Sequence, residues 1–205
     1  LEWIKIANEY KIPTFVLGVG LGGLIILNLL EKTELPIEGI LLFSPMLELK
    51  RDYKGRKNKL ISNVGKISKD TRFKVGITPQ DLTRNDEIIE ETANDGLMLK
   101  KVTYSWYNLI NEKMKETMDH IRDIKPISAL IMYGTNDKIL ETQSINEMKD
   151  KLKSKEMYFK VWDGLYHEIH NEPERDLVMR YVLSFLNNSV NTMGFIVNEE
   201  EIEDI

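Results

Sequence analysis

The sequence contains no cysteine, and this absence removes several kinds of chemistry from consideration. Without a thiol the chain can form no disulfide, no cysteine nucleophile and no thiolate metal site. Histidine is scarce as well, with three residues in 205, and no group of histidine, aspartate and glutamate has the spacing of metal ligands. We therefore expect neither a metal nor another cofactor.

The sequence also has no excess of basic residues. The chain has 28 lysine and arginine residues against 33 aspartate and glutamate residues, which gives a formal net charge of −5. Nucleic-acid-binding proteins usually have a net positive charge or one strongly basic face. The basic run at residues 50–59 is expected to be a solvated loop, with a patch for anionic lipid headgroups as the alternative. The charge balance argues against a nucleic-acid partner.

The apolar stretch at residues 14–30 is short for a membrane span. A spanning helix needs about 20 consecutive apolar residues, and Pro13 and Glu31 bound this stretch on its two sides. Four glycines within six positions also disfavour a continuous helix here. The expected location is therefore cytoplasmic, with peripheral contact to a membrane as a further expectation.

Short apolar runs alternate with helical segments along the chain. The runs at residues 14–18 and 39–43, and those within "ISALIMYG" and "MYFKVW", are typical of buried parallel strands. Amphipathic segments of helical periodicity separate them. This alternation predicts an α/β fold with a mostly parallel sheet and helices on both faces.

Between the second and third apolar runs lies a long segment of charged and helical stretches without a further apolar run, which predicts an inserted domain. We expect residues 1–45 and 126–190 to form the core, and residues 46–125 to form a helical cap without a strand of its own. A Thr-Pro pair in "GITPQDL" predicts the start of one cap helix. Residues 191–205 are expected to be a solvated acidic tail.

The glycine cluster in "FVLGVGLGGL" matches a dinucleotide-binding turn in its spacing. Gly18, Gly20 and Gly23 form G-x-G-x-x-G after a strand and before a helix. That interpretation requires a carboxylate at the end of the next strand, to hold a ribose hydroxyl. The next strand ends at Ser44, and no carboxylate follows until Glu48, which weakens the interpretation.

The same cluster also matches a nucleophile elbow, G-x-S-x-G, in which a sharp strand-to-helix turn presents the nucleophile. Gly18 and Gly22 occupy the two flanking positions, and Gly20 occupies the position of the nucleophile. An elbow further requires the order nucleophile, acid, histidine along the chain. Asp137 follows the third strand and His167 follows the fourth, so the order is satisfied.

Several segments together resemble one family. "PTFVLGVGLGGLIILNLL" is similar to its elbow, "GILLFSP" to the following strand end, "MYGTNDKIL" to its acid loop and "LYHEIHNEPER" to its histidine loop. In the cap, "GITPQDLTRNDE" and "KKVTYSWY" are similar to its lid. The chain thus resembles the bacterial monoacylglycerol lipase and lysophospholipase-like α/β-hydrolases, also called the serine aminopeptidase S33 group.

The resemblance implies roles for particular residues and also shows where this chain departs from the family. Asp137 would be the acid and His167 the base, but Gly20 stands where the family has its serine. The backbone N–H of Leu21 would supply one donor of the oxyanion hole. The family's N-terminal half-sheet and the loop with the second donor would lie before Leu1, so that half-sheet is expected to be missing here.

The cap contributes the candidate substrate-binding residues. Met98, Tyr104, Trp106 and Tyr107 could line a groove for an acyl chain, and packing inside the lid is the alternative for side chains at helical spacing. The expected partner is accordingly a small lipid or ester.

Other serines and histidines have weaker claims. Neither Ser44 nor Ser105 lies on an elbow, so neither is expected to replace the nucleophile. His120 is expected at the surface or its boundary, and His170 either bonds locally or influences His167.

The sequence therefore predicts a relative of carboxylic ester hydrolases that act on monoacylglycerols or lysophospholipids, with activity impaired at Gly20. A non-catalytic lipid- or partner-binding pseudoenzyme is the alternative, and a Rossmann-type cofactor binder is the third interpretation. The strand at residues 14–18 would lack a neighbour, so we also expect an N-terminal segment or a partner protein to complete the sheet.

Overall fold

Four parallel strands form the central sheet of a computed structural model that describes residues 2–50 and 70–192. Their spatial order is β1-β2-β5-β6, and every neighbouring pair is parallel. The strands are β1 (Phe15–Val19), β2 (Gly39–Phe43), β5 (Ser128–Gly134) and β6 (Met157–Trp162). All four expected strands are present, and the predicted α/β fold with a mostly parallel sheet is confirmed.

The two central strands are the most apolar. Every residue of β2 and of β5 is buried, as expected for parallel strands covered on both faces. β6 is half-buried along its length. Within the described residues β1 has a neighbour on one side only, and its Leu17 is 49% exposed.

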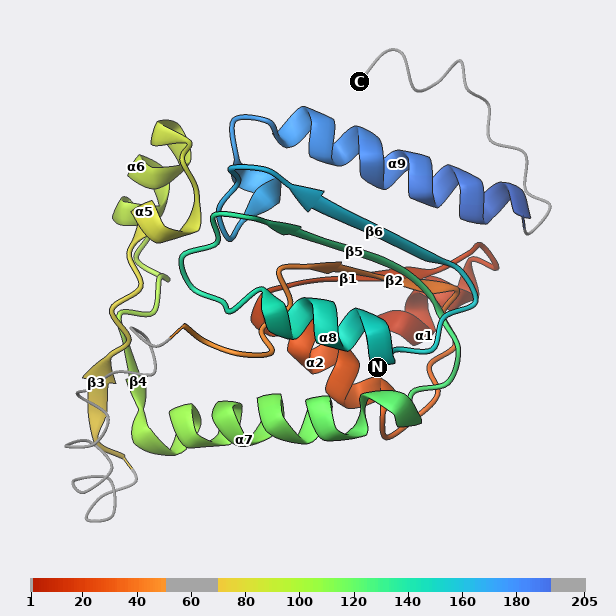
Figure 1. Cartoon of the computed structure of the whole chain (residues 1–205), viewed down its shortest axis with the longest axis horizontal. Helices are drawn as coiled ribbons and strands as arrows, with labels where there is room; N and C mark the ends of the chain where they lie inside the picture. Colours follow the sequence, from red (N-terminus) through yellow and green to blue (C-terminus); the bar gives the residue numbers. More distant parts are fainter. Residues whose placement is uncertain (1, 51–69, 193–205) are drawn as a thin grey trace.

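Helices cover both faces of this sheet (Figure 1). One face carries α2 (Leu21–Leu30) and α8 (Gln143–Lys151), and the other carries α9 (Arg175–Thr192). The first helix, α1 (Glu2–Glu9), precedes β1 and has no buried residue. The expectation of helices on both faces is confirmed.

Alternation along the strands divides the core into two parts. Ile40 and Leu42 of β2 belong to the cluster that α2 and α8 cover. Leu41 and Phe43 belong to the cluster that α9 covers. Because successive side chains of a strand point to opposite faces, an uninterrupted apolar strand builds both parts of the core at once.

The expectation of a cap without strands is wrong. β3 and β4 pair antiparallel as a separate two-stranded sheet. Each strand has three residues, which is too short to show the alternation by which a strand is recognised. Between Met46 and Lys125 the described elements are β3 (Arg72–Lys74), α5 (Pro79–Leu82), α6 (Asp86–Asn94), β4 (Lys101–Thr103), α7 (Tyr104–His120) and η1 (Ile121–Asp123).

The Thr-Pro helix start is confirmed. Thr78 is the N-cap of α5, and its hydroxyl donates to Asp81, whose carboxylate also accepts from the Thr78 backbone N–H at 2.8 Å. At the other end of the chain, α9 continues to Thr192, so the first two residues of the expected acidic tail are helical. Residues 193–205 of that tail, and residues 51–59 of the basic run, lie outside the described residues.

None of the helices in the described part of the chain combines the length and the apolar character needed to cross a bilayer. The apolar stretch at residues 14–30 divides instead into β1, a turn at Gly20 and α2. The turn forms where the glycines fall, at the carboxyl end of a buried strand.

Candidate active site

Gly20 forms the sharp turn between β1 and α2. Its backbone angles are φ 51° and ψ −114°, a combination that residues with a side chain rarely adopt. The turn is fixed from both sides, because the Gly20 N–H donates to the Phe43 carbonyl and the Gly20 carbonyl accepts from the Met46 N–H, each at 2.9 Å. This is the strained strand-to-helix geometry of a nucleophile elbow.

Asp137 lies in the loop after β5 and is fully buried. Its Oδ1 accepts the backbone N–H groups of Ile139 and Leu140, at 2.8 and 2.9 Å. Its Oδ2 lies 2.8 Å from Nδ1 of His167. Because a carboxylate can only accept, the His167 Nδ1–H donates to it, which fixes the tautomer of the imidazole.

His167 lies in the loop after β6 and is 6% exposed. Its second ring nitrogen, Nε2, faces the elbow. A Cβ atom placed on Gly20 would lie 3.0 Å from Nε2. The structure thus brings Gly20, Asp137 and His167 together, although 117 and 30 residues separate them along the chain, as their numbers show.

This arrangement contains an oriented base but no attacking side-chain atom. An imidazole held by a buried carboxylate can take a proton through Nε2 and carry the resulting positive charge. Leu21 is the first residue of α2, where a backbone N–H has no acceptor within the helix. That N–H can therefore stabilise a negatively charged oxygen near the elbow.

The four candidate substrate-binding residues of the cap do not converge on one surface. Tyr107 is buried and packs edge-on against Phe73, with ring centroids 5.4 Å apart. Tyr104 is half-buried, and Trp106 is partly exposed. Met98 lines a cavity of about 410 Å³ inside the cap, with lysines at its rim. The acyl-chain groove stays a prediction, and Tyr107 packs against Phe73 of β3.

A second apolar cavity, of about 220 Å³, lies beside the elbow between α2 and α7. Leu21 and Ile25 of α2 line it, and Ile110 of α7 closes it opposite. Sequence reasoning did not single out Ile110. Its position in an amphipathic helix gave no sign that it would face a cavity rather than the core.

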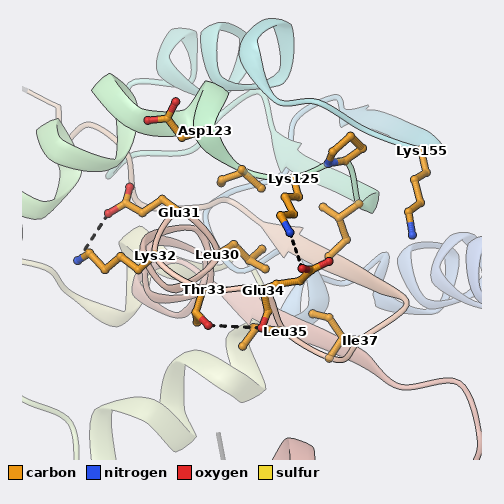
Figure 2. A pocket seen from close by; sticks show the side chains of 13 residues that line it. Leu30, Glu31, Lys32, Thr33, Glu34, Leu35, Ile37, Asp123, Lys125 and Lys155 are labelled. Carbon is orange, nitrogen blue, oxygen red and sulfur yellow. Dashed lines mark hydrogen bonds and ion pairs between the residues drawn. The ribbon is translucent and has the colours of Figure 1, made fainter.

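Another cavity lies at the opposite edge of the sheet (Figure 2). Residues 30–37, which lead into β2, and residues 123–127, which lead into β5, form most of its lining. It has a volume of about 180 Å³, and an ion pair of 2.6 Å joins Lys125 and Glu34 across it. Since Gly20, Asp137 and His167 follow the carboxyl ends of their strands, this cavity is remote from them.

Sequence reasoning missed several polar residues around the site. Glu172 is fully buried, and Arg84 of the cap binds it. Lys50 donates from Nζ to the carbonyl oxygen of Asp137. The available signal was the segment "HNEPER", which contains Glu172 and which the resemblance covered without assigning a role.

The remaining serine and histidine candidates occupy other environments. Ser44 is buried after β2 with φ 43°, and within the described residues its hydroxyl makes no hydrogen bond. His170 also has a buried Nδ1 without a partner among those residues, and burial lowers its pKa. His120 is exposed and pairs with Asp123 at 2.9 Å, a hydrogen bond that raises the pKa of His120.

Known proteins are similar to this chain in sequence or in fold. Phospholipase YtpA of Bacillus subtilis is 28% identical over 189 residues, which cover 92% of this chain and 73% of that protein. The Paleococcus ferrophilus monoacylglycerol lipase has 22% identity and a TM-score of 0.77, covering 92% of this chain and 75% of its own. A soluble variant of monoglyceride lipase from Saccharomyces cerevisiae has 18% identity and a TM-score of 0.80, with coverage of 91% and 65%.

One family matches most of the chain and not only its separate motifs. Residues 2–174 match the family described as serine aminopeptidase, S33. The matched region includes the elbow, the acid loop, the cap and the histidine loop. The dinucleotide-binding interpretation of the glycine cluster has no support from any of these similarities. The chain belongs to the serine aminopeptidase S33 family of α/β-hydrolases and is related to its monoacylglycerol lipases and lysophospholipase-type enzymes.

Proposed function

We propose that this chain is a carboxylic ester hydrolase in which catalysis is impaired, because the acid and base are retained and the nucleophile is not. One observation carries the proposal. His167 Nε2 lies 3.0 Å from the position of a Cβ on Gly20, so the base is aimed at an atom that this chain lacks. The hydrogen bond of 2.8 Å from His167 to Asp137 supports the same assignment.

The geometry defines the reaction that a serine at position 20 would perform. His167 would take the hydroxyl proton through Nε2 while the oxygen attacks the ester carbonyl. The Leu21 N–H would stabilise the resulting oxyanion. His167 would then return the proton to the leaving alcohol, and water activated by the same nitrogen would release the acid. Asp137 would hold the imidazole throughout. With glycine the first bond cannot form.

The proposed substrates are monoacyl esters of glycerol or of glycerophospholipids. The names of the relatives, a phospholipase and monoacylglycerol lipases, support this class. So does the apolar cavity of about 220 Å³ that begins at Leu21, next to the elbow, where an acyl chain could lie. Acting on such lipids, the protein would work at the surface of a membrane or micelle.

Turnover measurements test this proposal. We would compare this chain, Gly20→Ser and Gly20→Ser/His167→Ala on a monoacylglycerol and a lysophospholipid. Removing a triad member leaves about 10³–10⁴-fold catalysis over water, so we expect feeble turnover by this chain and a large gain in Gly20→Ser. His167→Ala should abolish that gain. Equal turnover by all three would contradict the proposal.

The two apolar cavities also support a second role, as a non-catalytic binder of lipid. Neither cavity depends on the missing hydroxyl, and together they offer space beside the elbow and within the cap. A non-hydrolysable monoacyl ether tests this role. Saturable binding that Ile110→Trp abolishes, in a folded Gly20→Ser protein without turnover, would favour it. Absence of binding would remove it.

We also propose that a further segment, from the same polypeptide or from another, pairs with the open edge of β1. Leu17 of β1 is 49% exposed, and β2 is its one neighbour in the described residues. The solved monoacylglycerol lipase is longer than this chain, which covers 75% of it. A paired edge would also shield an apolar surface from other chains.

A further inference from the structure

The two residues next to His167, Tyr166 and Glu168, each donate a backbone hydrogen bond. The backbone N–H of Tyr166 donates to Oε1 of Glu172 at 2.8 Å. The backbone N–H of Glu168 donates to the carbonyl oxygen of Leu82, in the cap, also at 2.8 Å. The backbone on the two sides of His167 is therefore held by one buried carboxylate and one cap carbonyl.

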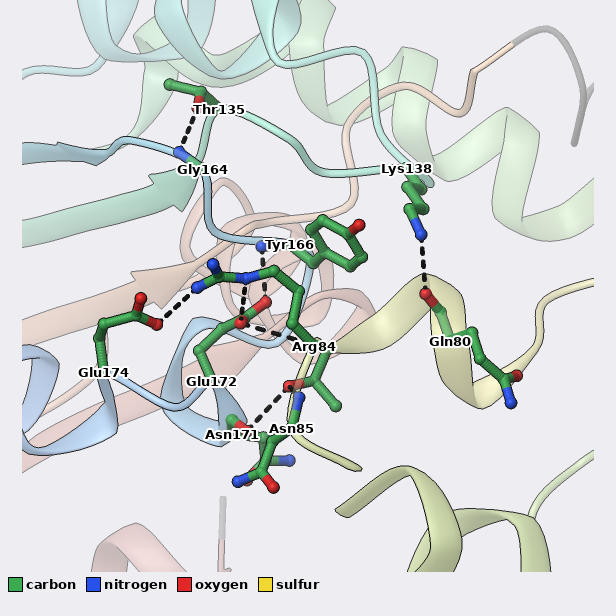
Figure 3. Close-up of polar contacts among 11 residues, drawn as sticks. Gln80, Arg84, Asn85, Thr135, Lys138, Gly164, Tyr166, Asn171, Glu172 and Glu174 are labelled. Carbon is green, nitrogen blue, oxygen red and sulfur yellow. Dashed lines mark hydrogen bonds and ion pairs between the residues drawn. The ribbon is translucent and has the colours of Figure 1, made fainter. Parts of the chain in front are cut away.

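The carboxylate of Glu172 depends in turn on the cap (Figure 3). Its Oε2 accepts from Nε of Arg84 at 2.8 Å, while its side chain is fully buried. Arg84 continues to Glu174, with 2.5 Å between its guanidinium and that carboxylate. Burying a carboxylate is unfavourable unless it is paired and hydrogen-bonded, so the ion pair with Arg84 holds Glu172 in place.

Further contacts join the same cap segment to both loops. The buried hydroxyl of Thr83 donates to the carbonyl of Asn171 at 2.8 Å. Lys138, next to the acid Asp137, donates to the carbonyl of Gln80 at 3.0 Å. Residues 80–84 thus contact the acid loop and the histidine loop directly.

We propose that Arg84 and Glu172 are positioning residues that make the orientation of His167 dependent on the placement of cap segment 80–84. Without the Arg84 guanidinium, the buried Glu172 carboxylate would lose its charged partner and would keep only backbone N–H donors, from Tyr166 and from residue 84. This loss frees the Glu172 side chain to move, which weakens its bond to Tyr166 and loosens the loop that carries His167. A shift of the cap segment would also remove the Leu82 carbonyl, so the base is fully aligned only when the cap is docked.

This inference rests on the proposed role of His167 as the base, but its test needs no turnover. The His167 Nδ1–H, bonded to Asp137, should give a low-field, slowly exchanging proton resonance in NMR spectra. The chain has three histidines, and His167→Gln identifies the signal. Turnover that Gly20→Ser failed to restore would count against the proposed function and leave this measurement unaffected.

The variants are chosen to separate positioning from general stability. In Arg84→Gln we expect exchange of this proton to accelerate by about tenfold, equivalent to about 1.4 kcal/mol. Arg84→Lys keeps the charge without the planar guanidinium. Its exchange rate for the His167 proton should lie between those of the unmodified chain and Arg84→Gln. Glu174→Gln removes the partly exposed partner of Arg84 and should exchange like the unmodified chain.

Two results would overturn the inference. One is unchanged exchange of the His167 proton in folded Arg84→Gln. The other is an equal acceleration of hydrogen exchange at the backbone amides of β5, which would show a general loss of stability instead of a local loss of alignment.

Glu172→Gln gives a second variant, because its amide oxygen can still accept from Tyr166 while the charge that binds Arg84 is gone. It should accelerate exchange less than Arg84→Gln does.

Discussion

Gly20 has a backbone conformation that a residue with a side chain would adopt only under strain. Left-handed and related conformations are unfavourable by about 1–3 kcal/mol for other residues, and Gly20 has φ 51° and ψ −114°. We therefore expect Gly20→Ala to lower the free energy of unfolding by about 1–3 kcal/mol, measured by urea denaturation. Glycine at position 20 would then give a more stable protein than a residue with a side chain.

Gly22 provides the matched control. It lies in α2, and a Cβ placed there would meet nothing within 4 Å. Gly22→Ala should leave stability unchanged or raise it by up to about 1 kcal/mol, since alanine favours helix. Equal effects of the two substitutions would show that the elbow is not strained.

His170 should make stability depend on pH. Burial lowers its pKa below the ordinary value of 6.5, with His167 adding to that effect and the charge of Glu168 opposing it. Because the unfolded chain then binds the proton more readily, stability is complete above pH 6.5 and falls as pH decreases below it. His170→Gln should show a smaller loss of unfolding free energy between pH 7.5 and 5.5, measured by denaturation at each pH.

His120 supplies the opposite case. Its hydrogen bond to Asp123 raises its pKa, so its small contribution to stability is present at low pH and is lost as pH rises through the raised value. His120→Asn should therefore steepen the decline toward low pH. A steeper decline in His170→Gln instead would contradict the assignment of a buried neutral imidazole.

At the scale of residues, the sequence was informative where a motif fixes chain order. Asp137 and His167 were predicted from their place after successive strands, and the structure brings them to 2.8 Å. The pairing of Arg84 with Glu172 was not predicted, because 88 residues separate them and no motif links the two segments. Contacts of this kind arise only when cap and core are docked.

At the scale of elements, β5 lies very close to the histidine loop. Because the acid loop follows β5 directly, this close approach keeps the acid loop and the histidine loop together. A Cβ on Gly134, the last residue of β5, would lie 2.1 Å from the Leu165 carbonyl oxygen. Overpacking usually lowers stability by about 1–3 kcal/mol, and we expect Gly134→Ala to reach at least the upper end of that range. Thermal and urea unfolding measure this loss.

Gly96 is the control for that substitution. It follows α6 in the cap, and a Cβ there would meet nothing within 4 Å. Gly96→Ala should unfold like the unmodified chain. If Gly134→Ala were as stable as the unmodified chain, the histidine loop could move away from β5 without lowering the free energy of unfolding. The close approach of β5 would then not be needed to hold this loop.

Elements were predictable in proportion to their apolar content. β2 was expected at residues 39–43 and is observed as Gly39–Phe43, because a buried strand must be apolar on both faces. β3 and β4 were missed, since strands of three residues, of which Val102 alone is buried, carry no recognisable pattern. The acidic tail was expected to begin at residue 191, but α9 continues to Thr192, because nothing in "NNSVNT" is a strong helix terminator.

At the scale of the whole molecule, the exposed edge of β1 should promote self-association. Unpaired strand edges with apolar side chains are sites of pairing between chains, and Leu17 is about half exposed there. We expect the 205-residue chain to associate as its concentration rises and Leu17→Lys to reduce this, measured by light scattering. Leu97→Lys, at an exposed residue of the cap, is the control. Identical association of both variants would exclude the edge as the cause.

At the scale of the whole molecule, the cap lies over the edge of the sheet where the loops of Asp137 and His167 lie (Figure 1). Figure 1 shows α5 and α6 beyond the carboxyl ends of β5 and β6, where Asp137 and His167 follow their strands. The division into a core and a cap at residues 46–125 stays a prediction. The sequence indicated an insertion by its change of texture, but the hydrogen bonds from residues 80–84 to both loops could not be read from it.

Covalent labelling with a fluorophosphonate, followed by intact mass measurement, tests most directly whether His167 serves a nucleophile position that is empty. A serine oxygen activated by the base displaces fluoride and keeps the phosphonyl group. We predict a labelled Gly20→Ser protein, with no label on this chain, on Gly20→Ser/His167→Ala, or on Gly22→Ser, whose hydroxyl would lie two residues along the same turn in open space. An unlabelled but folded Gly20→Ser protein, or equal labelling of Gly22→Ser, would contradict the account.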